Sequence, residues 1–347
     1  MKYVKTLLMT LAVVFAFSAM ACTPEEKPEY TFPNAPKPEP EPEKPDTPEP
    51  EKPDTPGQPD TPTPAPNAKP CFIWIDAAAN FKDYANDQSK IASDMAKIKE
   101  TGFSAVVVDV RPTNTGVLFK SSVEPALKRV DAWTPAYVWV ERTATFDYLQ
   151  AFIDAGKSVG LDVYASINTM VGGCLCPYDL GEDGVLYNDP SKKSWASVVN
   201  TENGLVNCLD LEEDTGAKFF NPANDKVVEY LLNLLGDLAK YDLDGIILDR
   251  CRYDDNELQS DFSDVSREKF EAYIGEQLEN WPGDIFAPGA DALTGNGTQM
   301  QKKWMEFRAK VIHDFVEKAH EALKEINPDL IIGDYTGAWY PTYWQLG

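Results

Sequence analysis

Short apolar runs that end on charged or polar residues alternate with amphipathic segments throughout the sequence after residue 70. One run, at 246–248, is followed at once by Asp249 and Arg250. Continuous runs of β-branched and apolar residues are typical of strands buried on both faces of a parallel sheet. Amphipathic segments between them indicate helical crossovers, so the pattern predicts an α/β fold. We expect strands at 71–77, 103–110, 161–167, 246–248 and 330–333.

Helical periodicity predicts helices at 87–101, 143–159, from residue 221 onward, and at 302–326. Five strand and helix units with right-handed crossovers favour an eight-stranded α/β barrel. The segment 169–220 is rich in Gly, Asp and Asn, and its pattern at 198–209 predicts only a small hairpin. That segment is too short for the missing crossover units of roughly 30 residues each. We therefore expect a (β/α)8 TIM-barrel type fold, truncated after about the fifth strand, with an open α/β sheet as the alternative.

The first 22 residues have the organisation of a secretory signal peptide. Lys2 and Lys5 precede a largely apolar run, and small residues follow that run before Cys22. This order of charge, apolar core and small residues is typical of export signals. The order Ser-Ala-Met-Ala-Cys at 18–22 resembles a bacterial lipoprotein cleavage box, which implies that Cys22 becomes the lipidated first residue of the mature chain. An ordinary signal peptide with a nearby cysteine is the alternative.

Residues 23–70 form a tail rich in Pro, Glu, Lys, Asp and Thr, in which Pro-Glu-Lys-Pro-Asp-Thr-Pro occurs at 42–48 and again at 50–56. Proline removes hydrogen-bond donors and favours extended backbone, so this composition predicts a disordered, semi-rigid linker. At about 3.1 Å per residue it spans on the order of 100 Å or more. We expect the folded domain to occupy 71–347.

The formal net charge is −24, and most of it lies after residue 70. A surface with this excess of carboxylates repels nucleic acid and anionic lipid headgroups, so we expect no nucleic-acid partner. Neutral and cationic sugars remain compatible ligands.

The cysteine pattern argues against a metal site. Cys174 and Cys176 are separated by one residue rather than by the two to four that are usual in zinc sites, and the chain has 2 His. No metal and no cofactor are therefore expected. In an exported protein the expected disulfide joins Cys208 to either Cys174 or Cys176.

Several segments together resemble a known family, the glycosyl-hydrolase-like group of bacterial lipoproteins. The resemblance runs from about residue 72 to 339, and its specific parts are Val-Val-Asp-Val-Arg-Pro at 107–112, Asn-Pro-Ala-Asn at 221–224, 241–249, and Trp304, Arg308 and Val311. The group includes enzymes proposed to cleave stripped peptidoglycan glycan strands. Arg250 stands where relatives usually have Asp, and 155–157 lacks their usual His. These departures imply a substrate different from that of the peptidoglycan enzymes.

Glycoside hydrolysis needs two carboxyl groups, one protonated and one charged, on opposite sides of the scissile bond. The carboxyl ends of barrel strands meet at one rim, where they supply such groups. We predict Asp249 as the nucleophile or base, with Arg250 and Arg252 lowering its pKa. Asp334, at the end of the fifth strand, is the predicted second carboxylate. The alternative is that these strand ends form structural ion pairs or caps.

Further polar and aromatic residues follow the same strands and are predicted to bind substrate at the rim. For Arg111 and Asp109 the alternative is an ion pair beneath the site. Exposed aromatic rings beyond a strand end present apolar faces on which sugars stack, whereas Trp74 lies within a strand and is expected in the core. The predicted substrate-binding set is Asp76, Asp109, Arg111, Asn168, Arg250, Arg252, Tyr335 and Trp339.

Together these features predict a cofactor-independent glycoside hydrolase that acts on a polysaccharide or glycan strand at the cell envelope. We expect an outer-membrane lipoprotein, held to the membrane by its N-terminal lipid and facing either the periplasm or the cell exterior. The acidic pair at 25–26 resembles export signals of surface lipoproteins. The alternative function is a non-catalytic surface lipoprotein that binds glycans.

Overall fold

The computed structural model describes residues 69–131, 138–177, 179–212, 216–254 and 257–337. The predicted signal peptide, Cys22, the linker up to residue 68 and Trp339 therefore lie outside the described residues. Within the described part, no helix combines the length and apolar character needed to cross a membrane.

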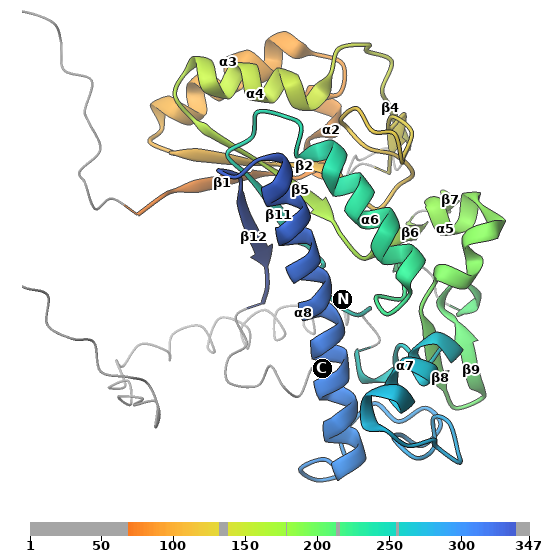
Figure 1. The fold of residues 1–347 in the computed structure, drawn as a ribbon. Coiled ribbons are helices and arrows are strands. Elements are labelled where there is room, and N and C mark those ends of the chain that lie inside the picture. Colours follow the sequence, from red (N-terminus) through yellow and green to blue (C-terminus); the bar gives the residue numbers. More distant parts are fainter. Residues whose placement is uncertain (1–68, 132–137, 178, 213–215, 255–256, 338–347) are drawn as a thin grey trace, which may run out of the picture. The chain divides into compact units, whose positions relative to one another are not determined.

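A five-stranded parallel sheet forms the centre of the domain (Figure 1), and it confirms the five predicted strands. Its order is β1-β2-β5-β11-β12. Each strand pairs with its neighbours in parallel. The strands are β1 (Phe72–Ile75), β2 (Ala105–Arg111), β5 (Asp162–Asn168), β11 (Gly245–Asp249) and β12 (Ile331–Tyr335).

Four helices between the strands match the predicted helical segments, namely α3 (Gln88–Glu100), α4 (Tyr148–Ser158), α6 (Asp225–Leu238) and α8 (Gln299–Ile326). Each begins at a residue whose side-chain oxygen accepts a hydrogen bond from a backbone N–H of the first turn, which satisfies a donor that the helix leaves free. A further helix, α2 (Ala77–Tyr84), was not predicted. Asp76 caps it, so β1 ends earlier than expected.

The two faces of the sheet carry different cores. The face toward the helices holds alternate strand residues such as Val106, Val163 and Leu248, together with the apolar faces of the helices. The opposite face, called the inner face below, carries a smaller cluster of Ala105, Val107 and Tyr164, against which Trp74 and Ile247 pack.

The sheet is strongly curled toward its inner face. β1 and β12 are its two edge strands, yet the rings of Trp74 and Tyr335, one from each edge, lie 5.1 Å apart. A flat sheet of five strands would place its edges about 19 Å apart. The curl is that of a barrel wall, with Trp74 directed to the inside.

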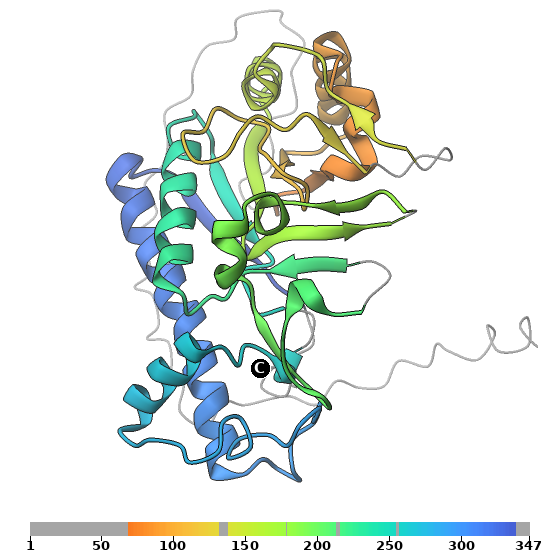
Figure 2. The ribbon, with the colours of Figure 1, turned by 90° about the vertical axis from the view of Figure 1, so that its right-hand side faces the viewer.

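The segment 169–220 is not a structureless loop (Figure 2). It forms an antiparallel sheet of β6 (Val171–Cys176), β7 (Gly181–Asp183) and β10 (Gly216–Phe219) in the order β10-β6-β7. The predicted hairpin is confirmed as β8 (Val198–Thr201) paired with β9 (Gly204–Asn207). Short helical turns complete it, namely α5 (Val185–Asn188), η1 (Pro190–Trp195) and η2 (Cys208–Asp210).

A second apolar cluster lies beyond the sheet, where η3 (Glu257–Gln259), α7 (Asp264–Ile274) and the first half of α8 meet. Its centre is Trp304, which is fully buried and stacks on Phe262 at 5.0 Å between ring centroids. Arg308 lies one turn further along α8, 4.2 Å from the centre of the Tyr253 ring. A two-stranded ribbon of β3 (Arg129–Val130) and β4 (Val140–Glu141) completes the described elements.

The predicted disulfide of Cys208 is wrong. Cys174, Cys176 and Cys208 are all free thiols, and all three are buried. Cys208 instead donates a hydrogen bond to the carbonyl of Phe219, at 3.6 Å. The prediction rested on the three cysteines lying in one expected loop, which does not show which strands bring two sulfur atoms together.

Candidate active site

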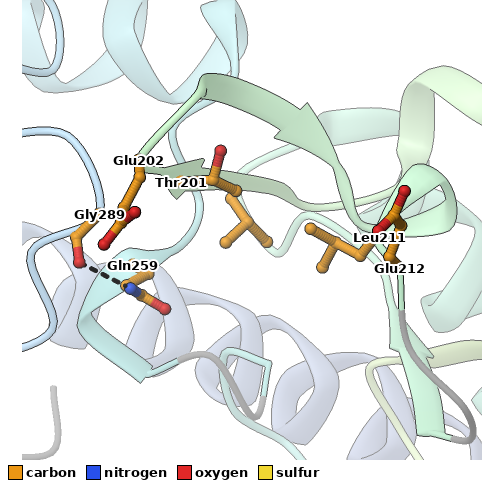
Figure 3. Close-up of a pocket in the computed structure, with 7 residues that line it drawn as sticks. Thr201, Glu202, Leu211, Glu212, Gln259 and Gly289 are labelled. Carbon is orange, nitrogen blue, oxygen red and sulfur yellow. Dashed lines mark hydrogen bonds between the residues drawn. The ribbon is translucent and has the colours of Figure 1, made fainter.

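An acidic cavity of about 300 Å³ lies between the β8–β9 hairpin and the segment that contains η3 (Figure 3). Glu202 and Glu212 line it, and Gln259 donates a hydrogen bond to the carbonyl of Gly289 at 3.1 Å. None of the predicted site residues lines this cavity. Asp109 and Asp249, two carboxylates whose pKa values are raised by burial, lie instead near the ends of β2 and β11.

Three carboxylates lie on the inner face of the sheet at the carboxyl ends of their strands. Asp109 pairs in register with Ser166, and Asp249 pairs with Asn168 two residues further along β5. Asp76 directly follows β1 and lies two residues after Trp74, so the alternation of the strand directs both to the inner face. The three are close enough to affect one another's ionisation. Among the described residues they are not one of the groups of His, Cys, Asp or Glu side chains whose ligand atoms all lie within 4.8 Å of one another.

Asp109 is the most perturbed of the three. It is 7% exposed, and it accepts hydrogen bonds from the backbone N–H groups of Arg111 at 3.2 Å and Ala77 at 3.4 Å. Burial, followed by the nearby charges of Asp76 and Asp249, raises the pKa of Asp109 to about 7. Near neutral pH a large fraction of Asp109 therefore carries a proton, as a general acid requires.

The pKa of Asp249 is shifted in the direction opposite to the prediction. Burial raises the pKa of Asp249, and it outweighs the backbone N–H of Arg250 and the charges of Arg250 and Arg252. The sequence showed the two arginines but not the burial. The pKa prediction is therefore wrong in direction, while the placement of Asp249 at the rim is as expected.

The backbone around Asp249 is held firmly. Arg250 adopts a left-handed conformation with φ of 47°, and its N–H donates to the carboxylate of Asp249 at 2.7 Å. The carbonyl of Asp249 accepts from Thr169 at 2.7 Å, and that of Arg250 accepts from Met170 at 3.2 Å. A left-handed arginine is unfavourable, whereas Asp tolerates this conformation better. The resemblance places Asp at this position in relatives.

Asp334 lies on the other face of the sheet end. Its register partner on β11 is Leu248, a member of the helix-side core, whereas Asp249 is paired with Tyr335. Burial, followed by the charge of Asp249, raises the pKa of Asp334 to about 6. The residue is nevertheless exposed to solvent, so water weakens the effects of both burial and the Asp249 charge on its pKa. The structure thus places Asp109, rather than Asp334, on the same face as Asp249, and a catalytic role for Asp334 stays a prediction.

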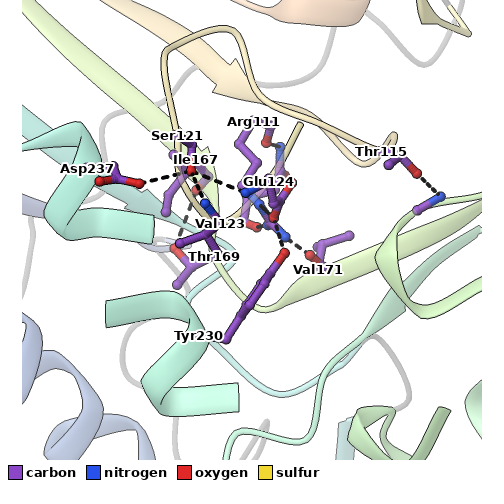
Figure 4. A network of polar contacts seen from close by, with 12 residues as sticks. Arg111, Thr115, Ser121, Val123, Glu124, Ile167, Thr169, Val171, Tyr230 and Asp237 are labelled. Carbon is purple, nitrogen blue, oxygen red and sulfur yellow. Dashed lines mark hydrogen bonds and ion pairs between the residues drawn. The ribbon is translucent and has the colours of Figure 1, made fainter. Parts of the chain in front are cut away.

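Arg111 is a buried member of a polar network (Figure 4). Its Nε donates to Glu124 at 2.8 Å, and its guanidinium also donates to the carbonyls of Asn168 and Val171. Glu124 in turn accepts from the hydroxyl of Tyr230 at 2.6 Å. The ion-pair partner of Arg111 is therefore Glu124 and not Asp109. Glu124 lies outside any predicted strand or helix, so no sequence signal marked it.

Of the remaining predicted binding residues, some are fixed by contacts within the protein and others are exposed to solvent. Asn168 is buried and donates to the carbonyl of Arg111 at 3.0 Å. Arg252 lies with its guanidinium 5.4 Å from the centre of the Phe219 ring. Tyr335 is 61% exposed and packs on Trp74, so this pair offers an accessible aromatic surface on the inner face.

A curled parallel sheet with carboxylates at its strand ends is the architecture of barrel-type glycosidases. The sequence matches the family described as Glycosyl hydrolase-like 10 over residues 71–340. The chain therefore belongs to the Glycosyl hydrolase-like 10 family, which confirms the resemblance drawn from its motifs.

The chain is similar to longer proteins. An S-layer-related protein of Niallia circulans is 30% identical over 290 residues, which cover 80% of this chain and 17% of that protein. The alpha-L-fucosidase isoenzyme 2 from Paenibacillus thiaminolyticus has a TM-score of 0.51 at 14% identity, over 78% of this chain and 33% of that one. The PgaB (BpsB) glycoside hydrolase domain from Bordetella bronchiseptica has a TM-score of 0.50 at 13% identity, over 76% and 64%. These structural likenesses concern the fold, which is of the (β/α)8 barrel type.

Proposed function

We propose that this protein is a glycoside hydrolase in which Asp109 is the proton donor and Asp249 is the anionic partner. The observation that carries the proposal is the pair of unlike carboxyl environments on one face of the sheet. Burial raises the pKa of Asp109 to about 7 against two backbone N–H groups, whereas at Asp249 the charges of two arginines and a backbone N–H oppose the rise that burial causes. The arginines favour the anionic form of Asp249, and burial favours the protonated form of Asp109, as the acid and base roles require.

The proposed reaction follows from these states. Asp109 transfers its proton to the leaving glycosidic oxygen, while Asp249 either attacks the anomeric carbon or takes a proton from the attacking water. The network of Arg111 and Glu124 holds the ends of β2 and β5 together beneath the site. Trp74 and Tyr335 provide the aromatic surface for a sugar ring.

We further propose that the enzyme works at the cell envelope as a lipid-anchored protein. The order of the first 22 residues supports export, and Cys22 is placed for lipidation. The proline-rich segment suits a tether that lets an anchored domain reach an immobile polymer. The net charge of −24 favours a neutral or cationic glycan over an anionic one.

A panel of bacterial and dietary polysaccharides, including peptidoglycan strands, tests the proposal through release of reducing ends. The full-length chain is expected to release them, and Asp249→Asn and Asp109→Asn to lose turnover while keeping affinity for the glycan. Asp334→Asn, on the other face, separates the two assignments: retained turnover supports Asp109 as the proton donor, and lost turnover supports the predicted role of Asp334. Binding without turnover by the unmodified chain across the panel would contradict the proposal and support the glycan-binding alternative.

A further inference from the structure

Two buried thiols and a carboxylate from distant parts of the chain converge beside the sheet. The Sγ atoms of Cys174 and Cys176, both on β6, and a carboxylate oxygen of Asp131 all lie within 4.8 Å of one another. The two sulfur atoms are 2.8 Å apart, and both cysteines are buried. Asp131 directly follows β3, more than forty residues earlier in the chain.

Asn114 is a second, independent sign that this cluster has a ligand. It is 4% exposed, and its Oδ1 has no hydrogen-bond partner among the described residues. Its amide faces the cluster, because Nδ2 lies 3.6 Å from the Sγ of Cys174 and 3.7 Å from that of Cys176, and the amide also contacts Asp131. The structure thus places a buried amide donor against both sulfur atoms, as hydrogen-bonding neighbours of metal-bound thiolates are placed.

We propose that Cys174, Cys176 and Asp131 bind one divalent cation of the zinc class, with the amide N–H of Asn114 donating to the thiolates. Two thiolates and a carboxylate oxygen are ligand types that zinc accepts, and thiolates select against magnesium and calcium. With bonds of about 2.0 to 2.3 Å, ligand atoms in a tetrahedral site lie about 3.3 to 3.8 Å apart. Shifts of about 1 Å in the ligand atoms from their present positions are sufficient to reach this spacing.

Residues that hold the proposed ligands in place by hydrogen bonds are already present. Asp183, the register partner of Cys174 on β7, accepts from the Nδ2 of Asn114 at 3.4 Å. It is fixed in turn by the hydroxyl of Thr115 at 2.7 Å and the N–H of Gly184 at 2.8 Å. A bound cation would join the end of β3 to the β6–β7 hairpin. Cysteine spacing alone did not reveal the site, because its third ligand comes from a separate element.

The test uses the full-length chain, reduced and stripped with a chelator, and then titrated with Zn²⁺ or with Co²⁺ as a spectroscopic substitute. About one metal per chain is expected, with a thiolate-to-cobalt charge-transfer band. The double variant Cys174→Ser/Cys176→Ser is expected to lose the band and the metal. The matched control is Cys208→Ser, which removes a buried thiol outside the cluster and is expected to bind normally. Circular dichroism verifies that each variant is folded.

A second measurement does not depend on any variant. In urea just below the unfolding midpoint, where buried thiols become transiently reactive, bound Zn²⁺ is expected to slow alkylation of Cys174 and Cys176, as mapped by peptide mass spectrometry, while Cys71, which is exposed, reacts at the same rate with or without the metal. Asp183→Asn is expected to lower affinity by about 10- to 100-fold. The proposal is overturned if the reduced chain binds neither metal, or if Zn²⁺ leaves the alkylation of both cysteines unchanged.

Discussion

Replacing Asp109 with asparagine tests whether its buried carboxyl group is protonated in the folded protein. The pKa of Asp109 is about 7, against an ordinary value of 3.8. At about 1.36 kcal/mol per pKa unit, this difference corresponds to about 4 kcal/mol. This is an upper limit, because water that enters on ionisation lowers the cost.

The direction in which stability changes with pH follows from proton binding at Asp109. Between pH 3.8 and about 7 the folded state binds more protons at Asp109 than the unfolded state does, so wild-type stability falls as the pH rises through this range. Asparagine cannot ionise, and Asp109→Asn removes that part of the slope. The free energy of unfolding of the variant, relative to wild type, is expected to rise by up to about 4 kcal/mol between pH 4 and pH 8. Urea denaturation at several pH values measures it.

Asp237→Asn is a control of opposite sign. Burial opposes ionisation of Asp237, but Lys240 and the hydrogen bonds from Ser122 outweigh it and lower the pKa to about 2. This variant is expected to be less stable than wild type at neutral pH by about 2 kcal/mol, with the difference shrinking as the pH falls below 4. Parallel pH profiles for wild type and Asp109→Asn would refute the reasoning about Asp109.

Three further predictions concern the support of the site and its pH dependence. Glu124→Gln leaves the buried guanidinium of Arg111 without its ion-pair partner and is expected to cost about 3 to 5 kcal/mol in urea denaturation; an unchanged midpoint would contradict the assigned pairing. Gly245→Ala places a Cβ 2.5 Å from the Tyr164 ring and 2.7 Å from a backbone oxygen, so a loss of about 2 kcal/mol or more is expected, and full stability would show that the sheet is less tightly packed there. In glycan hydrolysis, kcat/KM is expected to fall as the pH rises through about 7, where Asp109 loses its proton, and an activity that keeps rising to pH 9 would argue against Asp109 as the acid.

The sequence predicted the parallel sheet well because buried strands and capped helices are local patterns. All five strands and four helices appear close to the expected bounds. The structure of the region after β11 was harder to predict, because the packing of Phe262 on Trp304 depends on contacts between segments some forty residues apart. The antiparallel sheet in 169–220 was missed because its strands are short and rich in glycine.

The site was predicted in part. Strand ends identified Asp249, Asp109 and Asp76, because every parallel strand delivers its final residues to the same rim. The pairing of Asp249 with Asp334 followed sequence order, whereas the register shows which side chains share a face. The pKa of Asp249 depended on burial, which the adjacent arginines could not reveal. Glu124 approaches Arg111 only through the folded loop after β2.

Chemical rescue of Asp249→Ala by azide tests the central claim most directly, with an aryl glycoside of whichever sugar the polysaccharide panel identifies. A small anion that occupies the space of the missing carboxylate is expected to restore part of the turnover and to yield a glycosyl azide. Asp109→Ala is expected to retain activity on an aryl glycoside whose leaving group needs no proton and to lose it on the natural glycan. An Asp249→Ala variant that hydrolyses the glycan as fast as the wild type, with or without azide, would contradict the assignment.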